Sequence, residues 1–342
     1  TFGYESNIYK EKIFNKTVTY GSFEPAGQSG LTEVSRNKQT DRWDQYRNLT
    51  ANVTASYEKT IGKHDFKVMA GGSLETFKWA YTKASRMDFP NDDFGEINAG
   101  DATTAAAEGN STYSALASLF GRANYVYADR YLFEFTARYD GSSKFARGHR
   151  WGFFPSASLG WRISQEKFWQ ESKLANIFSD FKIRGSYGVV GDDNVSDYSA
   201  FDYLAGYDYN RGGSVIDGQY VVGSAPRGLP NQTLSWIKAK ILDIGVDMGF
   251  FNNRLTAQFD FFRRLRTGIP ESRYDVLLPS EVGFGLPKEN LRSDLHIGYD
   301  AMVRWADNIN DFNYSVGANV TYSRFYDWEQ YDDRRSNSWD RS

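Results

Sequence analysis

The acidic residues that open one long segment are the first candidates for chemistry in this sequence. Asp192, Asp193 and Asp197 lie beside Asn194, and no clear strand pattern follows them directly. Calcium takes several carboxylate, amide and carbonyl oxygens as ligands, and this cluster can supply some of them. Hydrated loop charges give the same pattern more often. The sequence therefore predicts no cofactor, with a calcium ion in this loop as the alternative interpretation.

The residue types that most enzymes need are absent or scattered. The chain has no Cys, and His64, His149 and His296 do not stand at metal-binding spacing with another ligand. The sequence contains no G-x-S-x-G elbow and no glycine-rich phosphate loop with a lysine. The net charge is −3, from 40 basic and 43 acidic residues, so a basic nucleic-acid footprint is absent too. These observations predict a protein that is not an enzyme and binds no nucleic acid.

Aromatic and charged residues of the same long segment suit a flat or extended ligand. Aromatic residues make up 17% of the chain, which is high for a soluble domain. Ring faces flanked by polar groups suit sugar rings, and they suit peptides nearly as well. The alternative is that these rings pack on their own segment or on a partner protein. The candidate substrate or partner contacts are Tyr203, Tyr207, Tyr209, Arg211, Asp217 and Tyr220.

The elements that must position these residues are strands in which apolar and polar residues alternate regularly. Within residues 130–140, every odd-numbered position from Tyr131 to Tyr139 is apolar, whereas the even-numbered ones include Glu134 and Arg138. Residues 151–164 and 311–323 repeat this pattern. Successive side chains of a strand point to opposite faces, so each segment has one apolar and one polar face.

The alternation predicts about eleven strands, several of them longer than the roughly 5–6 residues usual in soluble proteins. No stretch approaches the roughly 18 consecutive apolar residues of a membrane-spanning helix, but a transmembrane barrel needs only every second strand residue to be apolar. The expected strands are 8–22, which is the weakest, 48–58, 66–74, 119–127, 130–140, 151–164, 181–189, 242–250, 255–261, 295–305 and 311–323.

Short and long connections alternate between these strands. This parity puts all short turns at one end of the sheet and all long loops at the other, as in outer-membrane barrels. Two connections depart from this rule. Connection 145–150 is short although it lies at the end of the long loops. Connection 165–180 is long although it lies at the end of the short turns, and it has the pattern of a short helix. The expected short turns are 61–64, 128–129, 252–253 and 308–310, and the expected long loops are 23–44, 87–112, 192–235 and 267–292.

The polar faces of the strands carry charges that should point into the lumen of such a barrel. We expect them to pair with one another or to hold a plug through charge-assisted hydrogen bonds, and a merely hydrated wall is the alternative. The apolar side chains Phe133, Phe135, Phe259, Val316 and Val320 should face lipid, opposite Glu134, Thr136, Gln258 and Asn319. The expected lumen-facing charges are Glu134, Arg138, Arg162, Arg184, Asp247, Asp260 and Arg304.

Three motifs in order resemble the SusC/RagA family of TonB-linked outer-membrane transporters of Bacteroidota. They are RYDGSSKFARGHRWGFFPSASLGWRIS (138–164), FKIRGSYGVVGDDN (181–194) and FFNNRLTAQFDFF (250–262), and the resemblance extends over about residues 114–325. It implies a plugged barrel of about 22 strands, of which this chain holds about half. The chain departs from the family pattern at Asp192, where an Asn is common, and over residues 283–298.

The resemblance gives the expected organisation of the protein. Residues 1–342 should be one partial transmembrane β-barrel domain. Both ends look internal, so we expect a fragment of a longer protein whose plug domain and closing strands lie outside this chain. Half a barrel leaves two unpaired strand edges in lipid, which is not viable alone.

The same resemblance implies TonB-dependent import of an oligosaccharide or peptide across the outer membrane. Expected partners are a SusD-like surface lipoprotein, membrane lipid, and TonB–ExbB–ExbD acting through the plug. A passive porin is the first alternative, and a soluble or surface β-sheet adhesion protein is the second. The substrate and the oligomeric state do not follow from the sequence.

Overall fold

The computed structural model describes residues 1–23, 29–93, 95–194, 201–273, 276 and 278–329. Its main element is an eleven-stranded sheet, and each of the eleven predicted segments overlaps one of its strands. The strands, in spatial order, are β1 (Phe2–Asn15), β4 (Lys38–Ile61), β5 (His64–Met87), β6 (Ala106–Tyr127), β7 (Tyr131–Ser142), β8 (Trp151–Arg162), β9 (Phe178–Asp192), β12 (Ile237–Phe250), β13 (Leu255–Glu271), β14 (Glu289–Ile309) and β15 (Phe312–Glu329).

Several strands extend far beyond the predicted segments, and two hairpins stand where loops were expected. β4 and β5 have 24 residues each, because strand pairing continues into polar sequence where the alternation of apolar residues has ended. The prediction of plain loops at 23–44 and 192–235 is therefore wrong in part. The first region holds β3 (Ser29–Ser35), whose partner β2 (Val18–Phe23) lies mostly in the predicted strand 8–22, and the second holds β10 (Tyr207–Ile216) and β11 (Gln219–Pro226).

The connections follow the predicted parity. The turns β4–β5, β6–β7, β12–β13 and β14–β15 are short, and the connections at the opposite strand ends are longer. Loop 87–112 holds the 3-10 turns η1 (Ile97–Ala99) and η2 (Ala102–Thr104), and loop 267–292 holds η5 (Ser280–Val282). The predicted short helix is confirmed as α1 (Lys167–Gln170), between η3 (Ile163–Gln165) and η4 (Lys173–Asn176). In the described residues, no helix has the length and apolar character needed to cross a membrane.

The chain divides into two compact units, of which the first comprises residues 1–51 and 74–115. It contains β1 paired with β4, and its loop residues are fixed by side-chain bonds. Asn37 accepts a hydrogen bond from the backbone N–H of Phe89 at 2.7 Å and donates to the Asp92 carboxylate at 2.9 Å. The Asn37 and Thr17 donors hold the pKa of Asp92 below its ordinary value.

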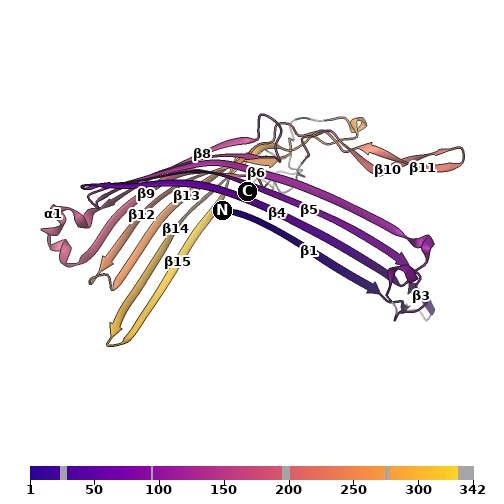
Figure 1. Cartoon of the computed structure of the whole chain (residues 1–342), viewed down its shortest axis with the longest axis horizontal. Helices are drawn as coiled ribbons and strands as arrows, with labels where there is room; N and C mark the ends of the chain where they lie inside the picture. The colour runs from indigo at the N-terminus through magenta and orange to yellow at the C-terminus, as the bar shows by residue number, and fades with distance from the viewer. Residues whose placement is uncertain (24–28, 94, 195–200, 274–275, 277, 330–342) are drawn as a thin grey trace, which may run out of the picture. The chain divides into compact units, whose positions relative to one another are not determined.

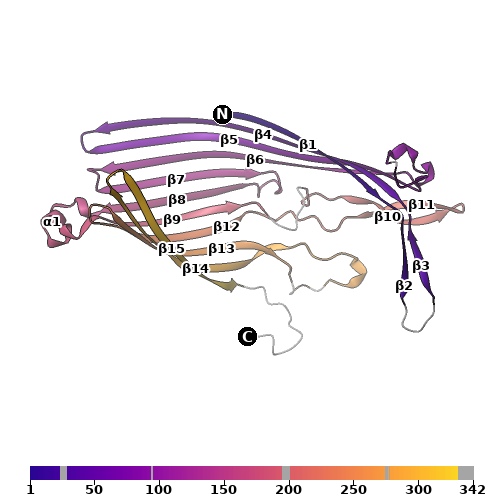
Figure 2. The same ribbon diagram turned by 90° about the horizontal axis from the view of Figure 1, so that it is seen from below.

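The second unit comprises residues 52–73 and the described part of 116–342. Figures 1 and 2 show its strands from β7 onward side by side, following the pairing order β7-β8-β9-β12-β13-β14-β15. Directly paired residues share a face, so the register defines rows across the sheet. One row runs through Phe133, Leu159, Gly185, Ile244 and Phe261.

The two faces of this second unit differ strongly in polarity. Leu159 is 64% exposed and Ile244 is 49% exposed, although both are large apolar residues. The predicted lipid-facing residues Phe133, Phe135, Phe259, Val316 and Val320 are exposed as well, so they are not packed inside a sandwich. Leaving such side chains in water costs about 25 cal/mol per Å² of apolar surface. This face therefore requires an apolar environment.

A small buried core lies where the loops of the second unit meet its strand ends. Phe145 is only 1% exposed and packs with Phe154 and Trp236. The connection 145–150 therefore folds inward at Phe145. Arg150 donates from Nε to the Phe145 carbonyl at 2.9 Å, which closes the connection on itself.

Candidate functional site

Among the described residues, β9, β12 and β13 carry a connected network of charged side chains on the face opposite the exposed apolar residues. Arg184 on β9 is paired with Gly245 on β12, and Gly245 is paired with Asp260 on β13. The Arg184 guanidinium donates to the Asp260 carboxylate at 2.7 Å, with Nη2 as the donor. Its Nε reaches Asp247 at 3.2 Å and its Nη1 reaches Asp243 at 3.3 Å. One planar cation thus holds three carboxylates from two strands.

The Arg184 side chain can extend over β12 and reach Asp260 on β13 because residue 245, which lies between them, is a glycine. A Cβ added to Gly245 would lie 2.1 Å from Asp260 Oδ1 and 2.8 Å from the Cζ atom of Arg184. Any side chain would therefore displace the ion pair. Glycine weakens a strand interior, and such a glycine often marks a close approach of other groups. Here the approaching groups are the two ends of the Arg184–Asp260 bridge.

The network carries more negative than positive charge. Lys182 pairs with Asp247 at 3.0 Å, so Lys182 and Arg184 face Asp243, Asp247 and Asp260. Asp300 on β14 lies directly opposite Asp260. Neither Asp260 Oδ1 nor Asp300 Oδ1 has a hydrogen-bond partner among the described residues. Both oxygens are buried, so a further donor reaches them only when the surrounding side chains move.

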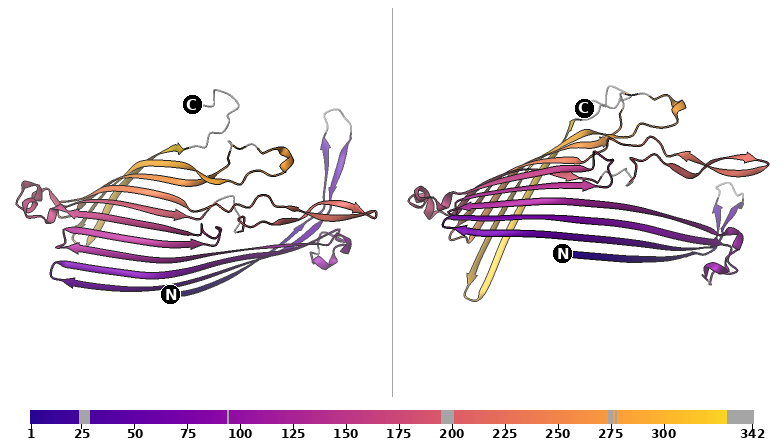
Figure 3. Two further views of the ribbon diagram at one scale, coloured as in Figure 1. Left: turned by 90° about the horizontal axis from the view of Figure 1, so that it is seen from above. Right: turned by 45° about the horizontal axis from the view of Figure 1, so that its top comes forward.

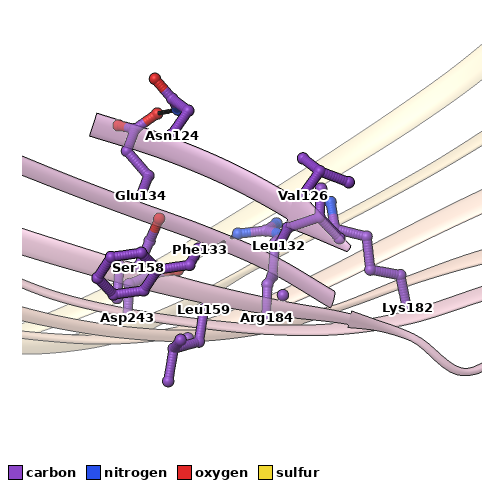
Figure 4. Close-up of a pocket in the computed structure, with 13 residues that line it drawn as sticks. Asn124, Val126, Leu132, Phe133, Glu134, Ser158, Leu159, Lys182, Arg184 and Asp243 are labelled. Atoms are coloured by element: carbon purple, nitrogen blue, oxygen red, sulfur yellow. Dashed lines mark hydrogen bonds and ion pairs between the residues drawn. The ribbon is translucent and has the colours of Figure 1, made fainter. Parts of the chain in front are cut away.

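A pocket of about 260 Å³ with both polar and apolar lining residues borders this network (Figure 4). Glu134, Ser158, Ser186 and Asp243 form one row across four strands on its polar side. Figure 4 shows Asn124 and Glu134 pointing toward each other, joined by a 2.5 Å hydrogen bond, with Leu159 on the other side of the ribbons. Because the side chains of Ser158 and Ser186 are small, they leave space between the carboxylates of Glu134 and Asp243 at the two ends of the row.

The other predicted charges are not part of the network. Arg138 pairs with Asp140 at 3.1 Å and lies over the ring of Phe120. The buried Nε of Arg162 has no hydrogen-bond partner among the described residues. Arg304 is exposed on β14 and forms no ion pair within the part of the chain that the structure describes. The structure thus brings together Arg184, Asp247 and Asp260, places Glu134 in the pocket that borders them, and leaves Arg138, Arg162 and Arg304 apart.

The candidate contacts of the long segment separate into two places. Tyr203 accepts a hydrogen bond from Arg150 Nη2 at 3.2 Å, beside the buried core. The other five lie on hairpin β10–β11, which extends beyond the strand ends (Figure 3). Tyr209 is 84% exposed, and Tyr207 and Tyr220 are exposed as well. Asp217 has a positive φ of 51° followed by Gly218 at 74°, so it forms the hairpin turn.

The acidic cluster is accounted for by protein contacts where it is described. Asp193 accepts from Ser142 at 2.7 Å and pairs with Lys144 at 3.3 Å. Asp192 accepts from the backbone N–H of Asn194 at 2.8 Å. Asp197 lies outside the described residues. No group of three or more His, Cys, Asp or Glu residues in the described part is arranged to hold a metal ion.

Sequence reasoning missed Lys182, Asp243 and Gly245. The signal was present in the segment DIGVDMGF, where Asp243, Gly245 and Asp247 alternate with apolar residues and so share one face. The alternation does not give the register of β9, β12 and β13, and it is this register that places Gly245 between Arg184 and Asp260.

Comparison with known proteins agrees with this architecture. A model of the family "TonB dependent receptor-like, beta-barrel" matches residues 1–341. The chain is 32% identical to TonB-dependent receptor SusC of Bacteroides thetaiotaomicron over 285 residues, which are 82% of this chain and 27% of that protein. It is 30% identical to TonB-dependent receptor P3 of Formosa agariphila, with the same two coverages, 82% and 27%.

A solved structure of the RagAB peptide transporter is similar with a TM-score of 0.73 and 25% identity, over 95% of this chain and 34% of that one. The chain spans about a quarter of the length of the curated relatives it matches. Proteins of this kind are integral to the outer membrane, as the alternation predicts. The chain therefore belongs to the TonB-dependent receptor-like β-barrel family and, within it, to the SusC/RagA type.

Proposed function

We propose that the protein containing this chain imports a nutrient across the outer membrane by TonB-dependent transport. The two-faced sheet carries this proposal: an exposed apolar face opposite a polar face with the Arg184 network. In an outer-membrane barrel the apolar face contacts lipid and the polar face lines the lumen. Residues 1–342 then form part of the barrel wall, and the plug and closing strands belong to the rest of the protein.

The Arg184 network is the proposed contact of this wall with the plug. Its three carboxylates, Asp243, Asp247 and Asp260, outnumber its two cations, Lys182 and Arg184. A plug segment with an Arg or Lys side chain fits this arrangement, since charge-assisted hydrogen bonds favour a cationic donor. A hydrated lumen wall without plug contact is the alternative.

The proposed substrate is an oligosaccharide or a peptide captured with a SusD-like lipoprotein. Support comes from hairpin β10–β11, whose aromatic side chains Tyr207, Tyr209 and Tyr220 are exposed. Rings on a projecting hairpin suit both a ligand and a covering protein. The similar RagAB structure is that of a peptide transporter, which keeps the peptide among the candidates. We propose no catalytic role for any residue.

A passive porin remains the competing function, because it has the same two-faced wall. The second alternative, a soluble or surface β-sheet adhesion protein, does not fit a chain that belongs to a family of integral outer-membrane proteins.

Native purification separates the two membrane functions. The complex is extracted from the source outer membrane in detergent, and its polypeptides and bound small molecules are identified by mass spectrometry. Import predicts a much longer chain that carries a plug, a co-purifying lipoprotein, and uptake that stops when TonB is deleted. A plug-free chain whose uptake continues without TonB would support the porin and contradict the proposal.

A further inference from the structure

An apolar groove crosses the second unit on the face opposite the Arg184 network. It has a volume of about 580 Å³ and lies over β6, β7, β8, β9 and β12. Almost all of its walls are aromatic or aliphatic. The lining residues on the apolar face are Tyr125, Tyr131, Phe133, Leu159, Trp161, Ile183, Gly185 and Ile244, and the neighbouring row of the other face, Leu132, Gly160 and Arg184, borders the groove as well.

The groove is centred on Gly185. In the row that crosses the sheet, Gly185 lies between Leu159 and Ile244. Because glycine has no side chain, a space is left between these two large side chains. A Cβ on Gly185 would meet only the Asp243 carbonyl oxygen within 4 Å, at 3.8 Å. Its φ is outside the left-handed region, so the backbone does not require glycine here. Glycine costs strand stability, and neither turn geometry nor close packing accounts for it at this position.

The end of the groove near the short turns is closed by two rings with fixed polar atoms. Tyr131 and Trp161 stack with centroids 6.4 Å apart. The Tyr131 hydroxyl and the Trp161 indole N–H both donate to Glu166, at 2.7 and 3.2 Å. Arg130 also pairs with Glu166, at 3.2 Å. Aromatic rings with one apolar side and one polar end are typical of the membrane–water interface.

These features place the groove just inside the periplasmic boundary of the membrane. Short turns lie on the periplasmic side of outer-membrane barrels. The groove is continuous with the apolar face that this integral outer-membrane protein must turn to lipid. The molecules present on that face at that depth are the phospholipids of the periplasmic leaflet.

We propose that this groove is a specific binding site for one acyl chain of a periplasmic-leaflet glycerophospholipid. The chain fills the space above Gly185 between Leu159 and Ile244, and the head group lies at the level of Tyr131 and Trp161. Arg130, paired with Glu166 beside these rings, is a cation at the level of the phosphate. The site belongs to the wall itself and does not depend on which nutrient is transported.

Filling the groove tests the proposal on the full-length protein extracted from the outer membrane in mild detergent. Gly185→Leu occupies the space without a backbone clash. Gly121→Leu is the matched control, since Gly121 also lies on the apolar face, outside the groove, and its Cβ would meet only Met69 O at 3.6 Å. Native mass spectrometry counts the phospholipid that each variant retains, and Gly185→Val is measured in parallel in case the leucine variant does not assemble.

The wild type and Gly121→Leu should retain a bound phospholipid. The Gly185 variants should retain about tenfold less, as expected when roughly two methylene groups lose their buried contacts. Equal retention in the Gly185 variants and the wild type would overturn the proposal. So would a lipopolysaccharide, or a second copy of the protein, as the molecule that the wild type holds there and the Gly185 variants lose.

Discussion

Trp236 donates its indole N–H to the backbone carbonyl of Arg150 at 2.8 Å, and this bond joins connections that are 86 residues apart in the sequence. Phe145 and Phe154 pack against the same indole ring. The loop end of the second unit is therefore organised around one buried tryptophan rather than held by its strands alone.

Replacing this tryptophan by phenylalanine should loosen the connection between β7 and β8. Trp236→Phe keeps an aromatic ring but leaves the Arg150 carbonyl without its donor, at a cost of about 1–3 kcal/mol. Amide hydrogen exchange in residues 143–150 of the full-length protein should become faster. Trp151→Phe, in which the ring is exposed on the apolar face, is the control and should leave this exchange unchanged.

Gly245→Ala should weaken the barrel wall by breaking the Arg184–Asp260 bridge. The added Cβ would lie 2.1 Å from Asp260 Oδ1, so the charged groups must separate. Because these side chains are 18–31% exposed, we expect a loss of about 1–3 kcal/mol rather than the larger cost of a fully buried pair. The denaturation midpoint of the full-length protein in detergent measures it, with Gly121→Ala as the control. A midpoint equal to that of the control would contradict the assigned role of Gly245.

Glu166 should make the connection between β8 and β9 sensitive to acid. Hydrogen bonds from Tyr131 and then Trp161 lower the pKa of Glu166 from its ordinary value of 4.5. The stabilisation is therefore complete above that ordinary pKa and is lost as the pH falls through the lowered one. Amide exchange in residues 163–177 should accelerate in acid for the wild type.

Two variants check this assignment. Glu166→Gln should show faster exchange already at neutral pH and little further change in acid. Glu171→Gln alters an exposed carboxyl in the same connection and should behave like the wild type. Wild-type acid sensitivity that persists in Glu166→Gln would assign the effect to another group.

Truncating the hairpin tyrosines should reduce binding without reducing stability. Tyr207, Tyr209 and Tyr220 are exposed, and surface substitutions usually change stability by no more than about 0.5 kcal/mol. The triple alanine variant should lose most of the co-purifying lipoprotein or of the bound substrate, while its denaturation midpoint stays the same. Full retention of both would remove this hairpin from the proposed contacts.

The strands were predictable because each carries its own alternation. Tyr131 to Tyr139 shows the pattern without any knowledge of its neighbours, and β7 forms there. Hairpin β10–β11 was missed although Asp217-Gly218 is a strong turn signal, because Gly212 and Gly213 interrupt the flanking pattern at a register shift. The Arg184 network and the groove at Gly185 depend on strand order and register. Those are long-range properties that no single segment contains.

Paired cysteine labelling tests the central claim that one face of this sheet meets lipid and the other meets water. The chain has no Cys of its own, so single cysteines can be placed at the neighbouring positions Ser158 and Leu159, and at Asn319 and Val320. In the full-length protein in its membrane, cysteines at 158 and 319 should react with a small water-soluble thiol reagent. Those at 159 and 320 should react only with a reagent that partitions into lipid. Equal or reversed labelling within both pairs would contradict the barrel wall described above.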